Sequence, residues 1–162
     1  MSTITGYYSC PLGLLEIEAE KDTLVAVKFL SDDFPNKPDQ DADSAIIAET
    51  IKQLTQYFAS ERKQFDIPVK LLGTEFQMQV WKELRNIPFG QTISYGQLAD
   101  RLGSRDLVRA VGSANGKNPI GIIIPCHRVI GGQGDLVGYA GGLWRKQWLL
   151  EHEGSQQLLP LF

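Results

Sequence analysis

Three consecutive isoleucines, Ile122 to Ile124, run directly into Pro125, and Cys126 and His127 follow at once. A short run of β-branched residues predicts the end of a buried strand. Proline has no backbone N–H to donate, so regular strand pairing is expected to stop at Pro125. The sequence therefore predicts a thiol and an imidazole where a buried strand breaks off, in the wall of a pocket.

The thiol of Cys126 has two interpretations. A free cysteine is among the most buried residue types and often packs as a small hydrophobic residue. Neighbouring side chains on an extended strand point to opposite faces. A direct bond between the thiol and the His127 ring would therefore need a turn at Pro125 or a bridging water. These residues alone leave inert packing and chemistry both open.

The length of 162 residues suits one domain or two small ones. The apolar runs are too short to span a membrane, and the N-terminal residues have no signal-peptide pattern, so we expect a cytoplasmic protein with no membrane partner. Cys10 and Cys126 do not make a disulfide framework, and the sequence has no CxxC or HExxH motif. GxGxxG and GxxxxGK[ST] motifs in the required context are also missing, so we expect no metal and no cofactor.

Charge is distributed unevenly along the chain. Residues 1–72 carry seven basic and twelve acidic side chains, whereas residues 73–162 carry nine and seven. Residues 101–128 hold five basic side chains and a single acid, Asp106. Local charge decides an electrostatic surface, so the net charge of −3 does not exclude DNA as a partner. A solvated basic surface explains the same charges equally well.

The first 72 residues predict a small α/β domain. Residues 3–9, 14–20 and 23–30 alternate as strands do, and residues 32–43 are polar with two prolines and predict a loop. Ser44 caps a helix whose apolar stripe is Ile47, Ile51, Leu54 and Phe58. Residues 65–71 predict one more strand.

Residues 73–162 predict a second, mostly helical domain, so the expected fold class is α/β (α+β). Thr74 with Gln77 and Ser94 with Gln97 match the capping box at helix starts. Gly103 should end the second helix, and a third is expected over residues 105–115. Two short helices around a tight glycine turn predict a helix-turn-helix. A last helix is expected over residues 143–153.

The third helix is unusual because small residues are concentrated toward its C-terminal end. A helix that reads the major groove usually offers long polar side chains to base edges. Small residues instead let the backbone approach a surface closely, which suits a minor groove or sugar-phosphate backbone; close packing inside the protein is the alternative. Arg109 is the long side chain beside Ala110, Gly112, Ser113, Ala114 and Gly116.

Motifs spread over residues 73–154 resemble one known family, in order and spacing. It is the methylated-DNA–protein-cysteine methyltransferase, or O6-alkylguanine-DNA alkyltransferase, family, and the resemblance is loose over the first 72 residues. The matching motifs are Gly73-Thr74, Phe76-Gln77, Val80-Trp81, Ile87-Pro88-Phe89-Gly90, Ser94-Tyr95-Gly96, Arg109-Ala110-Val111-Gly112, Asn118-Pro119, Pro125-Cys126-His127-Arg128-Val129, Gly138-Tyr139 and His152-Glu153-Gly154.

The resemblance implies a catalytic set of five residues. Cys126 would be the nucleophile that takes the alkyl group, and His127 would act as its base through a bridging water, with Glu153 orienting the imidazole. Asn118 would shape the active-site turn, and Tyr95 would give a proton toward the leaving base. The product would be a thioether on Cys126, so each molecule would repair one lesion.

The resemblance also implies how DNA is held. The expected partner is double-stranded DNA carrying O6-alkylguanine, with O4-alkylthymine as a second substrate, bound by a monomer that rotates the damaged base out of the helix. Arg109 would fill the gap left in the stack. The implied DNA-binding residues are Arg109, Ala110, Ser113, Ala114 and Tyr95, and the implied base pocket consists of Tyr95, Val129, Tyr139 and Ala140.

This sequence departs from the family pattern at three places. Ala140 replaces the serine of some relatives, where a backbone contact would survive. Residues 104–107 differ from the commoner start of the third helix, which affects the helix entry and its phosphate contacts. Asn115 is polar where some relatives have an apolar residue, which affects how well the pocket accepts bulky alkyl groups. Two other classes remain as alternatives: a non-catalytic module that binds alkylated DNA, and a cysteine hydrolase or transcriptional regulator with a helix-turn-helix.

Overall fold

The computed structural model describes residues 3–30 and 44–155 of the chain. The described residues divide into two compact units. The first unit consists of the residues up to Leu72 together with residues 119–123, and the second consists of residues 73–118 and those from Ile124 onward. The chain therefore passes from the second unit into the first and back again just before Cys126.

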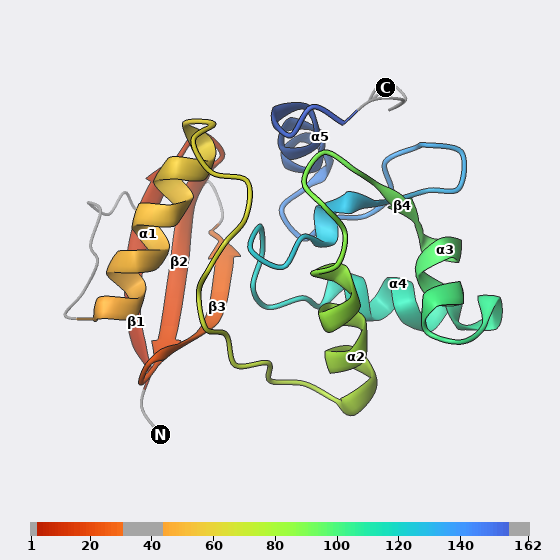
Figure 1. Cartoon of the computed structure of the whole chain (residues 1–162), viewed down its shortest axis with the longest axis horizontal. Coiled ribbons are helices and arrows are strands. Elements are labelled where there is room, and N and C mark those ends of the chain that lie inside the picture. Colours follow the sequence, from red (N-terminus) through yellow and green to blue (C-terminus); the bar gives the residue numbers. More distant parts are fainter. Residues whose placement is uncertain (1–2, 31–43, 156–162) are drawn as a thin grey trace. The chain divides into compact units, whose positions relative to one another are not determined.

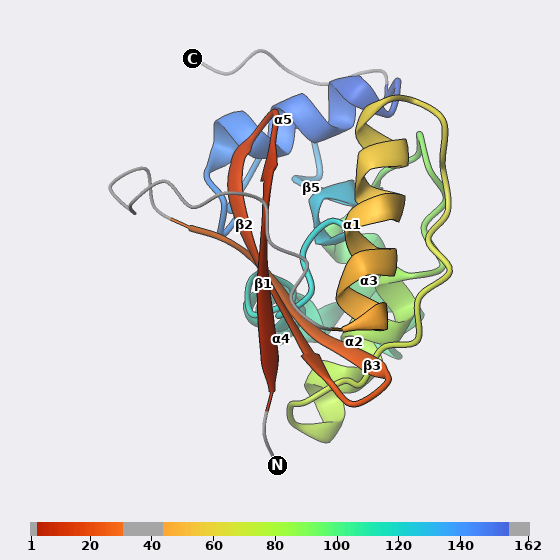
Figure 2. The ribbon, with the colours of Figure 1, turned by 90° about the vertical axis from the view of Figure 1, so that its left-hand side faces the viewer.

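The first unit is a three-stranded antiparallel sheet with one helix. Its strands are β1 (Ile4–Cys10), β2 (Gly13–Glu20) and β3 (Thr23–Phe29), in the order β1-β2-β3. The helix α1 (Ala45–Phe58) lies along one face of the sheet (Figures 1 and 2). Leu15, Ile17 and Ala19 alternate as buried residues on β2, and Leu54 is buried on α1. Burial of one apolar face explains the alternating pattern of β1 and β2, whereas the four consecutive residues 24–27 of β3 are all buried.

Two further segments of this unit were predicted from the sequence, a strand over residues 65–71 and a loop over residues 32–43. The strand expected over residues 65–71 is wrong: only Val69 pairs, through an isolated parallel bridge to Leu24. The carbonyl of Pro68 accepts from the N–H of Leu24, and Pro68 itself has no N–H with which to extend the pairing. The loop expected over residues 32–43 lies outside the described residues.

The second unit is mostly helical. It contains α2 (Glu75–Leu84), α3 (Tyr95–Arg101), α4 (Val108–Gly116) and α5 (Leu143–His152), with a two-stranded parallel pair, β4 (Ile93–Ser94) and β5 (Val129–Ile130). None of the helices in the described residues is long and apolar enough to cross a membrane. The indole N–H of Trp81 on α2 donates to the carbonyl of Ala114 on α4 at 2.9 Å, so these two helices pack in a fixed register.

The helix starts follow the local sequence closely. The side chains of Thr74 and Ser94 each accept a hydrogen bond from the backbone N–H three residues on. The side chains of Gln77 and Gln97 in turn accept from the backbone N–H of Thr74 and Ser94, so both capping boxes form. Gly103 adopts a φ of 121°, which ends α3. The next helix differs from expectation in its first turn, because Arg105–Leu107 forms the 3-10 helix η1 and α4 begins at Val108.

The isoleucine run is buried, but it is not a strand. Ile120 forms a parallel bridge to Val27 at the edge of β3, and the chain then turns at Ile122, whose φ is +69°. The prediction of a strand end at Ile122 to Ile124 is therefore wrong, since the backbone pairing stops before it. A turn at Pro125 does form: Cys126–Arg128 is the 3-10 helix η2, and the N–H of Arg128 donates to the carbonyl of Pro125.

Candidate active site and DNA-binding face

Cys126 opens the 3-10 turn η2 and is buried. Its carbonyl accepts a hydrogen bond from Nδ2 of Asn115 on α4 at 3.3 Å. Nδ2 of Asn118 donates to the carbonyl of Ile124 at 2.8 Å, which ties the residues after α4 to the start of this turn. Burial raises the pKa of the Cys126 thiol, while Asn118 and the charge of Lys146 act in the opposite direction.

His127 and Glu153 form a buried pair. Nε2 of His127 lies 2.8 Å from Oε2 of Glu153, and both side chains are fully buried. Arg128 holds the same carboxylate through Nε at 2.8 Å and Nη2 at 3.0 Å, and its Nη1 donates to the carbonyl of Ile87. Burial alone would raise the pKa of Glu153, but His127 and Arg128 outweigh burial and hold that pKa well below its usual range.

The protonation of His127 follows from these contacts. Burial lowers the pKa of His127 in spite of Glu153, so the ring is neutral near pH 7. The two hydrogen bonds from Arg128 are enough to keep Glu153 ionised as an acceptor, and Nε2 must then carry the single ring proton. Nδ1 has no hydrogen-bond partner among the described residues. The ring therefore offers a buried lone pair beside the residue that carries the thiol.

Tyr95 begins α3 and lies near Cys126 and Asn115. Its hydroxyl donates to the carbonyl of Val137 at 2.9 Å. Burial raises the pKa of Tyr95, the neighbouring Cys126 adds to the shift, and Asn115 opposes it. Tyr95, Asn115 and Cys126 are thus mutual neighbours, although they come from three different segments of the chain.

An apolar hollow of about 380 Å³ lies over α3 and α4. Its lining includes Tyr95, Arg109 and Gly112, so the structure brings two of the expected DNA-binding residues together there. Ala110 and Ser113 are exposed on the same helix. Ala114 differs, because its side chain is buried and its carbonyl accepts from Trp81.

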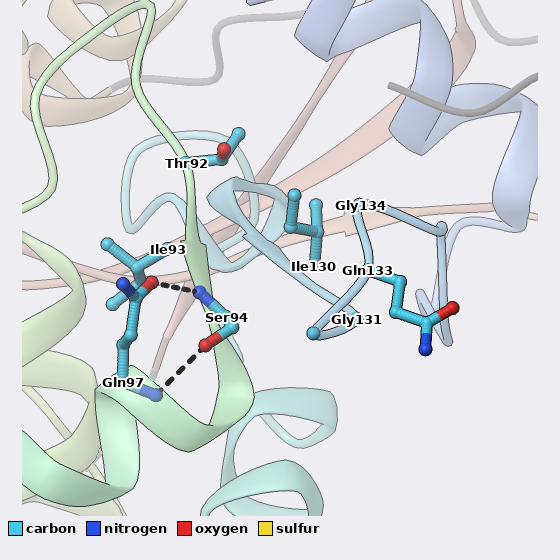
Figure 3. A pocket seen from close by; sticks show the side chains of 9 residues that line it. Thr92, Ile93, Ser94, Gln97, Ile130, Gly131, Gln133 and Gly134 are labelled. Atoms are coloured by element: carbon cyan, nitrogen blue, oxygen red, sulfur yellow. Dashed lines mark hydrogen bonds between the residues drawn. The ribbon is translucent and has the colours of Figure 1, made fainter. Parts of the chain in front are cut away.

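A second, more polar pocket of about 480 Å³ opens beside the β4–β5 pair (Figure 3). Ser94 and Gln97 line one side, where their capping hydrogen bonds are visible, and Ile130 lies across from them. The glycine-rich turn over residues 131–134 completes the wall, closed by a hydrogen bond from the N–H of Gly131 to the carbonyl of Asp135.

The remaining residues of the expected base pocket are spread over β5 and the loop before α5. Val129 is buried in β5, Tyr139 is half-buried, and Ala140 is exposed. Within the described ranges, no three His, Cys, Asp or Glu side chains gather in a group that could hold a metal ion.

Sequence reasoning gave no role to Lys146, which the structure places in this site. The side chain is fully buried, and Nζ donates to the carbonyls of Val137 at 2.8 Å and Gly138 at 3.2 Å. Burial lowers the pKa of Lys146 to about 8, although Cys126 and Asp135 oppose that shift. A signal was available, because Lys146 precedes Leu149 and Leu150 by three and four positions and so shares the apolar face of α5.

Comparison with protein families covers nearly the whole described chain. Residues 3–71 match the model for the 6-O-methylguanine DNA methyltransferase, ribonuclease-like domain, and residues 75–155 match that for the 6-O-methylguanine DNA methyltransferase, DNA binding domain. The chain belongs to the O6-methylguanine DNA methyltransferase family. Its activity is the repair of O6-alkylguanine in DNA by transfer of the alkyl group to a cysteine of the protein, and the chain binds DNA.

Individual relatives agree with this family. A methylated-DNA–protein-cysteine methyltransferase of Mycobacterium bovis is 45% identical over 147 residues, which cover 90% of this chain and 89% of that protein. A methylated-DNA–protein-cysteine methyltransferase of Methanosarcina acetivorans is 43% identical over 153 residues, which cover 91% of this chain and 96% of that protein. The crystal structure of the Mycobacterium tuberculosis O6-methylguanine methyltransferase has a TM-score of 0.84 at 42% identity, covering 94% of this chain and 93% of that one.

A further crystal structure, of the Mycobacterium tuberculosis OGT in complex with DNA, has a TM-score of 0.82 at 43% identity over 91% of each chain. The family membership confirms the resemblance inferred from the motifs, together with the α/β fold class and the methyltransferase activity. It also decides against the non-catalytic binding module and the hydrolase that the sequence left open.

Proposed function

We propose that Cys126 is the cysteine that accepts the alkyl group, with His127 as its base through a bridging water and Glu153 as the residue that orients the imidazole. The observation that carries this proposal is the buried His127 ring. Glu153 fixes its Nε2, and its Nδ1 lone pair is left without a protein partner. Burial raises the pKa of the Cys126 thiol, so the thiol needs a base to remove its proton. The free lone pair on Nδ1 of His127 can serve as that base.

The proposed reaction is a displacement at the alkyl carbon. The thiol proton passes through the water to Nδ1 of His127, and the Cys126 thiolate forms a new C–S bond as the bond from carbon to O6 breaks. The electron pair of that bond stays on the guanine, which takes a proton from Tyr95. The imidazolium formed on His127 faces the carboxylate of Glu153, so the positive charge that forms on the ring is stabilised by a negative charge already in place.

Three neighbouring residues prepare this site. Tyr95 donates to the carbonyl of Val137 in the free protein, and it must leave that carbonyl to reach a bound base. Lys146 also donates to Val137, so the carbonyl stays hydrogen-bonded when Tyr95 turns away. Asn118 keeps the turn before Cys126 in shape through the carbonyl of Ile124.

The proposed substrate is double-stranded DNA with O6-alkylguanine, and O4-alkylthymine as a second lesion, bound by a monomer in the cytoplasm, where thiols stay reduced. The exposed small residues of α4, Ala110 and Ser113, would let the helix approach the minor groove, with Ala114 behind them. Arg109 would enter the base stack as the damaged base leaves it. The base would then lie among Tyr95, Val129, Tyr139 and Ala140.

The experiment incubates the protein with a duplex carrying O6-methylguanine and measures its intact mass and the modified peptide. Wild type should gain one methyl group, once, on the peptide that contains Cys126. Cys126→Ser should gain none while still binding the duplex, because a hydroxyl is a far weaker nucleophile at neutral pH. Cys10→Ser is the matched control and should behave as wild type. Methyl uptake by Cys126→Ser would overturn the assignment.

A further inference from the structure

The loop between β5 and α5 carries Tyr139 and Ala140, two residues of the proposed base pocket. Residues 131–142 belong to no helix or strand. Val137 and Gly138, directly before Tyr139, line the apolar hollow over α3 and α4. A segment without regular backbone pairing has many accessible conformations, and selecting one of them costs entropy. Contacts from outside the loop must therefore fix the shape that receives a base.

The peptide group between Gly141 and Gly142 is held at both of its ends. Its N–H, on Gly142, donates to the carbonyl of Tyr139 at 2.9 Å. Its carbonyl, on Gly141, accepts from Nη1 of Arg145 at 2.8 Å. Gly142 has a φ of +90°, and neither glycine has a Cβ that would restrict rotation of this peptide group. The two hydrogen bonds therefore keep a freely rotating group in one orientation.

Arg145 is placed for this contact by the first turn of α5. Its side chain is buried, and its backbone N–H donates to the carbonyl of Gly142 at 3.2 Å. Its guanidinium carbon lies 4.4 Å from the centre of the Trp144 ring, an arrangement in which the cation attracts the aromatic face. A Cβ on Gly142 would lie 3.6 Å from Cδ1 of Trp144. Trp144 is 51% exposed, yet its ring holds the guanidinium beside the loop.

The next residue of α5 anchors the loop on the other side of Tyr139. Nζ of Lys146 donates to the carbonyls of Val137 at 2.8 Å and Gly138 at 3.2 Å. The anchored carbonyls therefore lie directly before and after the two pocket residues. Between them the chain has only Tyr139 and Ala140, so little freedom is left to the part of the loop that would contact a base.

We propose that Arg145 is a positioning residue of the methyltransferase site: it fixes the end of this loop so that Tyr139 and Ala140 are already in place when the base arrives. This inference rests on the proposed function, which assigns both residues to the base pocket. A guanidinium suits the task, because it donates in its plane while its face stacks on an indole. A loop fixed in advance favours binding of the base and leaves the chemistry at the thiol unchanged.

The first test measures the transfer of a benzyl group from free O6-benzylguanine to Cys126 at increasing concentrations of the base, followed by intact mass. The free base makes no DNA contacts, so half-saturation reports the pocket alone. Arg145→Met removes the donor and keeps a long side chain. The half-saturating concentration should rise about tenfold, which is the effect of one lost hydrogen bond from a charged group, and the plateau rate should stay within about twofold of wild type.

The controls separate positioning from structural damage. Arg145→Lys keeps a donor and should recover most of the lost affinity. Arg85→Met makes the same substitution at an exposed arginine and should behave as wild type. Alkylation of the Cys126 peptide by iodoacetamide should be equal in all four proteins. An unchanged half-saturating concentration in Arg145→Met would overturn the proposal, and so would a loss that appears in the plateau rate or in the iodoacetamide reaction.

A second measurement uses the wild-type protein and does not require a variant to fold. If the loop is fixed before the base arrives, the N–H of Gly142 should exchange with solvent at least about 100-fold more slowly than in an unstructured chain, as observed by NMR. Exchange at the unstructured rate would refute the inference. Failure of the proposed function is seen separately, as methyl uptake by Cys126→Ser, which neither measurement involves.

Discussion

Replacing Glu153 with glutamine tests the centre of the proposed reaction. Glu153 is buried and accepts three hydrogen bonds, one from His127 and two from Arg128, at 2.8 to 3.0 Å. The substitution keeps the shape of the side chain and removes only its charge. It therefore leaves His127 with a neutral partner and Arg128 with a buried charge that has lost its counterion.

Two magnitudes follow from these contacts. An imidazolium and a carboxylate with charge centres about 4 Å apart attract by about 4 kcal/mol at the effective dielectric of a protein, and this attraction appears only as His127 takes the proton. Each 1.36 kcal/mol is tenfold in rate, so alkyl transfer should slow by about 100- to 1000-fold. The unpaired Arg128 should also lower the free energy of unfolding by about 3 kcal/mol.

The assay is single-turnover transfer from a duplex with O6-methylguanine, at protein concentrations that saturate binding and at a temperature where the variant is folded by circular dichroism. Urea unfolding should show a midpoint lower by about 1–2 M. DNA affinity should stay the same, because Glu153 does not reach the surface. Glu151→Gln is the matched control, an exposed carboxylate on the same helix that should change neither quantity. A loss of transfer rate below tenfold in a folded Glu153→Gln protein would refute the reasoning.

Three further predictions concern the face formed by α3 and α4. Arg109→Ala should slow repair in duplex DNA at saturating protein while leaving the reaction with free O6-benzylguanine unchanged, since extrusion is a duplex-only step; a duplex defect that disappears at saturation would instead assign Arg109 to a phosphate contact. Gly112→Ala should fold with a free energy of unfolding raised by about 0.5–1 kcal/mol, because a Cβ there would meet the Tyr95 ring no closer than 3.9 Å. Gly112→Glu should also fold but should weaken DNA binding in a gel-shift titration, and unchanged affinity would remove α4 from the proposed interface.

The sequence predicted those elements whose cause is local. A capping box needs only residues three positions apart, so Thr74 and Ser94 marked their helices to the residue. The alternation on β2 likewise follows from the burial of one sheet face, which needs no knowledge of distant residues. The resemblance added the proposed catalytic set, because its motifs are also short and contiguous.

The elements that sequence reasoning missed depend on partners far along the chain. Ile122 turns because the backbone before it has already paired with Val27, and nothing near Ile122 records that partner. The apolar run correctly predicted that these isoleucines are buried, but it wrongly predicted that their backbone is a strand. Lys146 escaped notice for a related reason: its place on an apolar helix face was visible, but the carbonyls that receive its ammonium group lie in an irregular loop.

The return of residues 119–123 to the first unit has a consequence for synthesis on the ribosome. The N–H of Val27 donates to the carbonyl of Pro119, and the carbonyl of Val27 accepts from the N–H of Gly121. Strand β3 leaves the exit tunnel long before either partner does, so the nascent sheet must wait with this edge unpaired until most of the chain has been translated. The same stretch that completes the sheet leads directly into Cys126, so the first unit acquires its last strand partner only as the active-site turn emerges.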